Sequence, residues 1–130
     1  LAQHLVNAIP FNPWSPMVVI LGSGLLCIVM STFMSNSATA ALLIPILAAV
    51  GSGMQQELLP YGGVKTLIIG LALSASFAMA LPISTPPNAL AYAKGFIQQK
   101  DMALVGIIVG VISMILGYTL LVFVGKMGLL

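Results

Sequence analysis

Two polar interruptions inside long apolar runs constrain this chain more than any other feature of its sequence. The first is Ser-Asn-Ser at 35–37, inside the run 17–50, and the second is the stretch 82–88, inside the run 64–96. Within a membrane, an unpaired backbone group is tolerated only where it is buried in protein or lines a cavity. Two such breaks in one short chain predict that they meet and form a polar site.

The composition makes lipid the expected solvent for these runs. Of the 130 residues, 60% are hydrophobic and 5% are charged, whereas soluble domains carry about 25% charged residues. Such a chain cannot cover a water-exposed surface, so we expect an all-α, multi-pass protein of the cell membrane (the inner or plasma membrane). Its four cationic residues are scattered lysines without a basic patch, and nucleic acid is therefore not an expected partner.

The first apolar run has the length of a hairpin. Residues 17–50 would extend roughly 50 Å as one helix, whereas a bilayer core needs about 20 residues. The part that follows 35–37 has only about 13 residues, and segments of that length are typically re-entrant. We therefore predict a re-entrant hairpin over 17–50 with its tip at 35–37. Two tight membrane helices joined by a polar turn at the surface remain the alternative.

Two segments lack the character of membrane helices. Residues 1–16 contain three prolines and Trp14, and tryptophan favours the headgroup level, so this segment is predicted to be irregular or interfacial. Residues 51–63 are the most polar stretch and predict an aqueous loop in which Glu57 is solvated.

The remaining residues predict one broken helix and one continuous helix. Residues 64–99 form a transmembrane helix interrupted by the second polar stretch, with Asn88 as the cap of the helix that resumes. Residues 102–125 carry no charge and predict a final spanning helix. Gly106 and Gly110 form a small-residue pair on it that can seat a neighbouring helix.

The breaks suit an anion together with a cation. Unwound carbonyls and hydroxyls suit Na⁺, and helix N-termini carry about half a positive charge and suit an anion. One helix begins after Ser37 and another after Asn88, so both N-termini are predicted to point toward the middle of the membrane. This arrangement predicts a site for a small anion with accompanying sodium, built without arginine. The alternative is that these polar residues only satisfy the broken backbone.

The same residues carry a family resemblance. Ser-Asn-Ser-Ala-Thr at 35–39, followed by Leu-Leu-Ile-Pro-Ile at 42–46, resembles the Ser-Asn-Thr signature of the divalent anion:sodium symporters. The stretch 73–82, which leads into Thr-Pro-Pro-Asn-Ala at 85–89, resembles the second block of that family at a matching distance.

The resemblance implies an architecture and a function. The chain, which begins with Leu, would be a fragment, the C-terminal half of an inverted-repeat elevator transporter. Its partners would be the missing N-terminal half of the same transporter and, in a homodimer, a second copy. It would perform sodium-coupled symport of a divalent anion, with a C4-dicarboxylate such as succinate or malate as the expected substrate. A sulfate or citrate transporter, a sodium-independent exchanger of the same fold, and a non-transporting membrane packing subunit remain alternatives.

The resemblance also implies residue roles. The hairpin tip would contact both sodium and substrate, Ser84 would offer its backbone carbonyl, and Asn88 would help to hold the unwound segment. Ser37 stands where the family often has threonine. The implied substrate-binding residues are Ser35, Asn36, Ser37, Thr85 and Pro86. The implied sodium ligands are Ser35, Asn36, Ser84, Thr85 and Asn88.

Enzymatic chemistry is not expected. The membrane part contains no Ser/His/Asp set, no carboxylate pair and no cluster of metal ligands, and the only acids, Glu57 and Asp101, lie in predicted loops. His4 is the single histidine and has no acid near it in sequence. We expect Na⁺ as the coupling ion and no organic cofactor.

Overall fold

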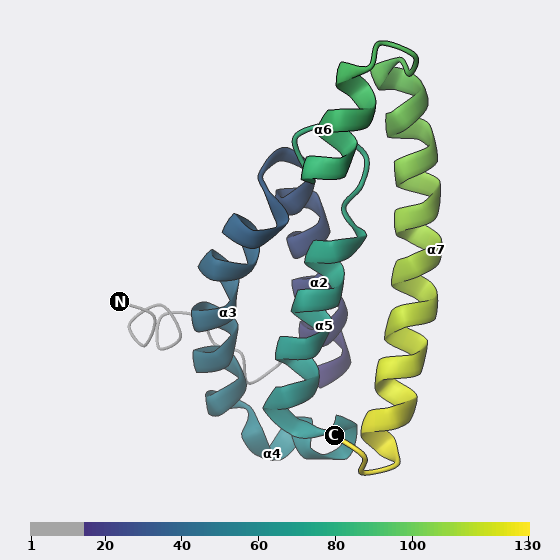
Figure 1. Ribbon diagram of the computed structural model, residues 1–130. Helices are drawn as coiled ribbons and strands as arrows, with labels where there is room; N and C mark the ends of the chain where they lie inside the picture. Colours follow the sequence, from purple (N-terminus) through teal and green to yellow (C-terminus); the bar gives the residue numbers. More distant parts are fainter. Residues whose placement is uncertain (1–14) are drawn as a thin grey trace.

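A computed structural model describes residues 15–130, and within this range the chain is helical without strands (Figure 1). The predicted all-α fold class is confirmed. The predicted irregular segment at 1–16, with His4 and Trp14, lies almost entirely outside the described residues. The elements are α2 (Pro16–Phe33), α3 (Asn36–Gly53), α4 (Gln55–Leu58), the 3₁₀ helix η1 (Leu59–Tyr61), α5 (Gly63–Phe77), α6 (Pro86–Ala93) and α7 (Gln99–Lys126).

Three of the described helices, α2, α3 and α7, are long and apolar enough to cross a membrane. A fourth candidate is the bent pair formed by Gln55–Tyr61 and Gly63–Phe77, whose axes differ by 70°. The described part of the chain therefore has the helix content of a multi-pass membrane protein.

The first break separates α2 from α3, and the chain reverses there (Figure 1). Ser35 caps α3, because its hydroxyl oxygen accepts a 3.2 Å hydrogen bond from the backbone N–H of Ala38. α3 has 18 residues, more than the short arm that the sequence predicts, because Val50 is buried and Gly51 packs closely against Val64 of α5. The length of this arm therefore no longer argues for a re-entrant hairpin, which stays a prediction.

The polar stretch 51–63 is helical over most of its length, where the sequence predicts a loop. Its polar residues, Glu57 included, are exposed, but Met54 and Leu58 are buried. Both side chains pack in a core cluster that includes Tyr118 of α7. Gly62 ends η1 with a φ of 97°, a conformation that glycine adopts without strain. Apolar anchors at one-turn spacing thus hold this segment in helical form.

α5 is the central helix, since it contacts α2, α3 and α7 (Figure 1). Leu71 and Ala75 of α5 are buried with Cys27 of α2 and Leu43 of α3. This second core cluster fixes the hairpin helices against α5, one to two turns away from the first break.

The second break begins when α5 ends at Phe77, and it lasts until Thr85. The prediction that Asn88 caps the resumed helix is wrong: Thr85 is the cap, and its hydroxyl oxygen accepts from the backbone N–H of Asn88 at 3.4 Å. Pro86 and Pro87 occupy the first turn of α6, where a missing N–H costs nothing. The helix therefore resumes at Pro86, earlier than the predicted position 89.

The sequence predicts that the glycine pair of α7 seats a neighbouring helix. Gly110 does contact the last residue of α5, whereas Gly106 contacts the unwound backbone that follows α5. A Cβ atom added to Gly106 would lie 2.5 Å from the Cα atom of Ala80 and 2.6 Å from the carbonyl oxygen of Met79. At Gly110 it would lie 3.0 Å from the carbonyl oxygen of Phe77. These two glycines let the second break lie directly on α7.

Candidate functional site

The two breaks lie in contact with each other. The backbone N–H of Asn36 donates to the carbonyl oxygen of Ser84 at 3.5 Å. The Ser84 hydroxyl, on a residue that is 2% exposed, donates to the carbonyl oxygen of Thr32 at 3.2 Å. These two bonds join the end of α2, the start of α3 and the unwound segment into one polar junction, which we call the break junction.

A buried hydroxyl that the sequence analysis did not assign also belongs to the break junction. Ser31, in the last turn of α2, is fully buried, and its Oγ lies 2.6 Å from Asn36 Oδ1 and 3.1 Å from the carbonyl oxygen of Ala75. The sequence signal that could have identified Ser31 is the adjacent pair Ser31 and Thr32, which lies one turn before the first break in an otherwise apolar helix.

Thr39 is a second buried hydroxyl to which the sequence analysis assigned no role. Its side chain is fully buried, and its Oγ1 has no hydrogen-bond partner within residues 15–130. It stands one turn after Asn36 and one turn before Leu43, on the buried face of α3. An unsatisfied buried hydroxyl costs roughly 1–3 kcal/mol, so this atom is an exception to the general pairing of buried polar groups.

Helix ends of opposite polarity meet at the first break. α2 ends at Phe33 and α3 begins at Asn36, so a helix C-terminus with about half a negative charge lies beside an N-terminus with about half a positive charge. In the first turn of α3, Asn36 and Ala38 use their N–H groups in the bonds already described. The N–H of Ser37 has no partner in the described part of the chain, so it is available to a ligand.

The N-terminus of α6 offers no such donor. Pro86 and Pro87 have no N–H, the N–H of Asn88 donates to the Thr85 hydroxyl, and the N–H of Ala89 donates to the Thr85 carbonyl at 3.1 Å. This end therefore contributes its dipole and the free proton of the Thr85 hydroxyl, while Pro86 can contribute only apolar contact.

The predicted site residues divide into two groups by position. Asn36 and Ser84 are in contact, Ser35 and Ser37 are exposed beside Asn36, and Thr85 and Pro86 follow Ser84 directly. These six residues lie at or directly beside the break junction.

Asn88 lies differently from the other predicted ligands. Its amide Nδ2 donates to the carbonyl oxygens of Met79 at 2.9 Å and Leu81 at 3.4 Å. It also lines a cavity of about 370 Å³ between α6 and α7, together with Asp101 and Gly106. Its position therefore fits the predicted role of holding the unwound segment better than that of a sodium ligand.

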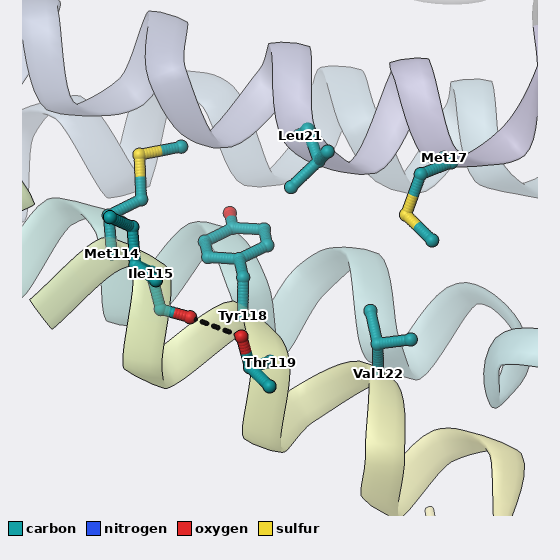
Figure 2. Close-up of a pocket in the computed structure, with 7 residues that line it drawn as sticks. All are labelled: Met17, Leu21, Met114, Ile115, Tyr118, Thr119 and Val122. Carbon is teal, nitrogen blue, oxygen red and sulfur yellow. Dashed lines mark hydrogen bonds between the residues drawn. The ribbon is translucent and has the colours of Figure 1, made fainter.

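A separate groove of about 440 Å³ lies between α2 and α7 and contains none of the predicted site residues (Figure 2). Apart from Thr119 and the Tyr118 hydroxyl, its lining is apolar. That hydroxyl lies 2.7 Å from Ser74 Oγ and donates to the Gly70 carbonyl at 3.0 Å, so it ties α7 to α5. We therefore take the break junction, and not this groove, as the candidate site.

The break junction provides neutral oxygen ligands. Its groups are hydroxyls, one amide and backbone carbonyls, which suit hard cations. Among residues 15–130, no group of three or more His, Cys, Asp or Glu side chains could hold a metal ion. Any sodium bound here would be held by neutral oxygens and by the C-terminal end of α2.

Comparison with known proteins gives a family and several relatives. Residues 1–128 match the model of the family described as "Sodium:sulfate symporter transmembrane region". The sodium-dependent dicarboxylate transporter SdcS of Staphylococcus saprophyticus is 34% identical over 101 residues, which are 78% of this chain and 18% of that protein. Human solute carrier family 13 member 4 is 35% identical over 116 residues, 89% of this chain and 17% of that protein.

A further relative is the protein "I'm not dead yet" of Drosophila melanogaster, which is 38% identical over 112 residues, 86% of this chain and 18% of that protein. The chain thus spans about a fifth of the length of the curated relatives it matches.

Proposed function

This chain belongs to the sodium:sulfate symporter transmembrane family, and from this membership we propose that it forms part of a transporter that carries a divalent anion across the membrane together with sodium. It is a multi-pass membrane protein, and its family consists of transporters and not of enzymes. The observation that carries the proposal is the contact between the two breaks, Asn36 N–H to the Ser84 carbonyl. The name of one of these relatives, the sodium-dependent dicarboxylate transporter SdcS, favours a C4-dicarboxylate such as succinate or malate.

Sodium is proposed to bind at the side of the break junction formed by the end of α2. The Ser84 carbonyl accepts one long bond from Asn36, and its second lone pair is available to a cation. The side chains of Ser35, Asn36 and Thr85 can add neutral oxygens. The C-terminal dipole of α2 favours a positive charge here.

The anion is proposed to bind at the start of α3. The free N–H of Ser37, the hydroxyl protons of Ser35 and Thr85, and the positive end of the α3 dipole favour an anionic oxygen. These groups are all neutral. A doubly charged anion removed from water is therefore left without a fixed countercharge, which is costly. Sodium bound beside the anion supplies the countercharge. The affinity for the anion therefore depends on sodium, and this dependence couples anion transport to sodium transport.

The hairpin over 17–50 is proposed to be re-entrant. Its end at Thr32 lines a cavity with Gly106 and Ile107 of α7, and Gly106 lies four positions inside the apolar run 102–125. The break junction then sits within the membrane, where irregular backbone is found only around a site or in protein. An elevator movement, a homodimer and a second hairpin elsewhere in the transporter complete this proposal. The relatives are much longer than this chain, which leaves room for the second hairpin.

The test is uptake by the full-length protein in proteoliposomes. An inward sodium gradient is expected to drive accumulation of labelled succinate or malate, and Asn36→Ala is expected to weaken it. Gln55→Ala, which removes an exposed amide near the far end of α3, serves as the control and should transport normally. The proposal fails if sodium drives no uptake of succinate, malate, citrate or sulfate; sodium-independent counterflow would identify an exchanger instead.

A further inference from the structure

The groove between α2 and α7 is a space that the proposed transport site does not use (Figure 2). α2 and α7 both pack against α5 but hardly against each other, and the space left between them is about 440 Å³. Ligand pockets in proteins have volumes of about 300–1,000 Å³. Both walls of the groove belong to helices that are long and apolar enough to cross a membrane. The groove is therefore large enough for a ligand that comes from the membrane itself.

The groove has the depth of one leaflet of a bilayer. On α7 its lining extends from Met114 to Val122, and Lys126 ends the helix one turn later. The distance from Met114 to Lys126 along the helix is about 18 Å at a rise of 1.5 Å per residue. One leaflet contributes about 15 Å to the hydrocarbon core of a membrane. If Lys126 lies at the headgroup level, the groove ends near the middle of the bilayer, as one acyl chain does.

The lining of the groove offers no hydrogen bond to a polar ligand. Apart from Tyr118 and Thr119, all lining side chains are apolar. The Tyr118 hydroxyl donates to the carbonyl oxygen of Gly70 at 3.0 Å, and the Thr119 hydroxyl donates to that of Ile115 at 2.6 Å. Both protons are thus used within the protein. A dicarboxylate would find no donor here, whereas a hydrocarbon chain needs none.

The size of the lining side chains favours a flexible chain over another helix. Close contacts of membrane helices are typically made by small residues, and on α7 Gly106 and Gly110 have this role toward α5 and the segment that follows it. The groove contains no glycine, alanine or serine in its lining, but it contains Met17 and Met114. Methionine side chains are flexible and adapt to an irregular apolar ligand.

A single positive charge stands at the mouth of the groove. Lys126 follows Ile115, Thr119 and Val122 at helical spacing, so it lies on the same face of α7 as the lining. Its Nζ atom is 5.6 Å from the centre of the Tyr61 ring, a contact that positions the ammonium group and leaves its N–H groups for an acceptor. The dipoles of the two helix ends here, the start of α2 and the end of α7, oppose each other. The charge of Lys126 therefore decides which headgroup is favoured.

We propose that the groove binds one acyl chain of an anionic phospholipid and that Lys126 holds the phosphate of this lipid. The bound chain fills the space between α2 and α7, and so it links the first helix of the hairpin to the last helix of the chain. The groove shares no residue with the break junction. Lipid binding is therefore independent of sodium and of the transported anion.

The first experiment tests the headgroup contact. A lipid that binds the folded protein raises its Tm, so the purified full-length protein is titrated in detergent with dioleoyl phosphatidylglycerol. The wild-type Tm should rise and then level off. Lys126→Gln should need about three- to tenfold more of this lipid for half of the rise, because one lysine charge is lost. Lys65→Gln is the matched control: it removes a lysine at the start of α5 that does not line the groove, and it should titrate like wild type.

The second experiment tests the acyl chain. Ile115→Trp places a larger side chain in the groove, whereas Leu116→Trp adds similar bulk at a neighbour that does not line it. Both side chains are exposed, at 62% and 65%, so both variants should fold. Native mass spectrometry should find phosphatidylglycerol bound to wild type and to Leu116→Trp but not to Ile115→Trp. Leu21→Trp, on the opposite wall, should behave like Ile115→Trp.

Two further ligands separate the parts of the lipid. Phosphatidylcholine with the same acyl chains keeps the phosphate but has no net charge, so it should raise the Tm only at higher concentration than phosphatidylglycerol does. Glycerol 3-phosphate keeps the phosphate and has no acyl chain, so it should leave the Tm unchanged. A rise with glycerol 3-phosphate equal to that with the lipid would contradict the role of the acyl chain.

The inference is overturned if phosphatidylglycerol leaves the wild-type Tm unchanged, or if Ile115→Trp and Leu21→Trp bind it as wild type does. A loss of binding in Leu116→Trp as large as that in Ile115→Trp would also overturn it. Lys126→Gln that titrates like wild type would refute the headgroup contact. A fall in Tm of Ile115→Trp without added lipid, combined with no lipid on wild type, would mean that another part of the transporter covers the groove. Sodium-driven uptake tests the proposed function separately from all of these outcomes.

Discussion

The Ser84 hydroxyl donates to the carbonyl oxygen of Thr32 over 3.2 Å, and this bond joins the unwound segment to the end of α2. The Thr32 carbonyl is one of the last four of its helix, which have no partner within the helix. Each break therefore supplies a hydrogen bond that the other lacks. Satisfying broken backbone and forming a site are thus compatible roles for the same residues.

Replacing Ser84 by alanine should destabilise the protein. The substitution leaves the partly buried Thr32 carbonyl without its partner, which costs about 1–3 kcal/mol. Thermal unfolding of the purified full-length protein in detergent measures the loss. Ser76→Ala removes an exposed hydroxyl that bonds to the Ala72 carbonyl of its own helix and should change stability by less than about 0.5 kcal/mol. Equal losses in the two variants would contradict the account.

Gly106→Ala should displace the unwound segment from α7. The added methyl group would lie 2.5 Å from the Cα atom of Ala80, and overpacking of this kind costs about 1–3 kcal/mol. Both Tm and sodium-driven uptake should fall. Gly22→Ala is the control, since its methyl group meets no atom within 4 Å; with alanine's better helix propensity it should be neutral or stabilising. Normal uptake by Gly106→Ala would show that the close contact is not needed.

Tyr118→Phe tests the connection between α7 and α5. It removes a hydroxyl that is 2.7 Å from Ser74 Oγ and donates to the Gly70 carbonyl, so a loss of about 1 kcal/mol is expected from the Tm. Gly24→Ala should cost more, because its Cβ would overlap the Tyr118 hydroxyl. The exposed Tyr92 provides the control in Tyr92→Phe. A Tm unchanged in both Tyr118→Phe and Gly24→Ala would refute this connection.

Thr39→Val should not destabilise the protein. The Thr39 hydroxyl is fully buried and has no partner within residues 15–130, so its replacement by a methyl group of similar size removes an unpaired polar atom and gains up to about 1 kcal/mol. Thermal unfolding in sodium-free buffer provides the measurement. A fall in Tm as large as that of Ser84→Ala would mean that this hydroxyl is satisfied in the full-length protein.

The sequence predicted where the helices break, because the signals there are local. Ser35 is a strong cap, and Pro86 with Pro87 can only begin a helix. It did not predict the helical form of 51–63, since that depends on burial of Met54 and Leu58 against distant helices. The sequence analysis also predicted that a helix packs against Gly106. The spacing of two glycines alone does not tell whether a helix or extended backbone packs against them.

The sequence predicted only part of the break junction, because only some of its residues stand out from their neighbours in the sequence. Residues 35–37 and 84–88 are polar within apolar sequence, so they stand out. Ser31 and Thr39 lie inside helices, where hydroxyls usually bond to their own backbone. Only the packing of α2, α3 and α5 reveals that Ser31 instead contacts Asn36 and Ala75.

The central claim, that the start of α3 lies in the transport site, is tested most directly by thiol labelling of Ser37→Cys in the full-length protein. The single native cysteine of this chain, Cys27, is fully buried and should not react. A membrane-impermeant thiol reagent should label Ser37→Cys, and sodium with succinate should slow that labelling several-fold. Ser52→Cys, exposed at the other end of α3, should label at the same rate with or without them. Labelling of Ser37→Cys that sodium and every tested anion leave unchanged would contradict the claim.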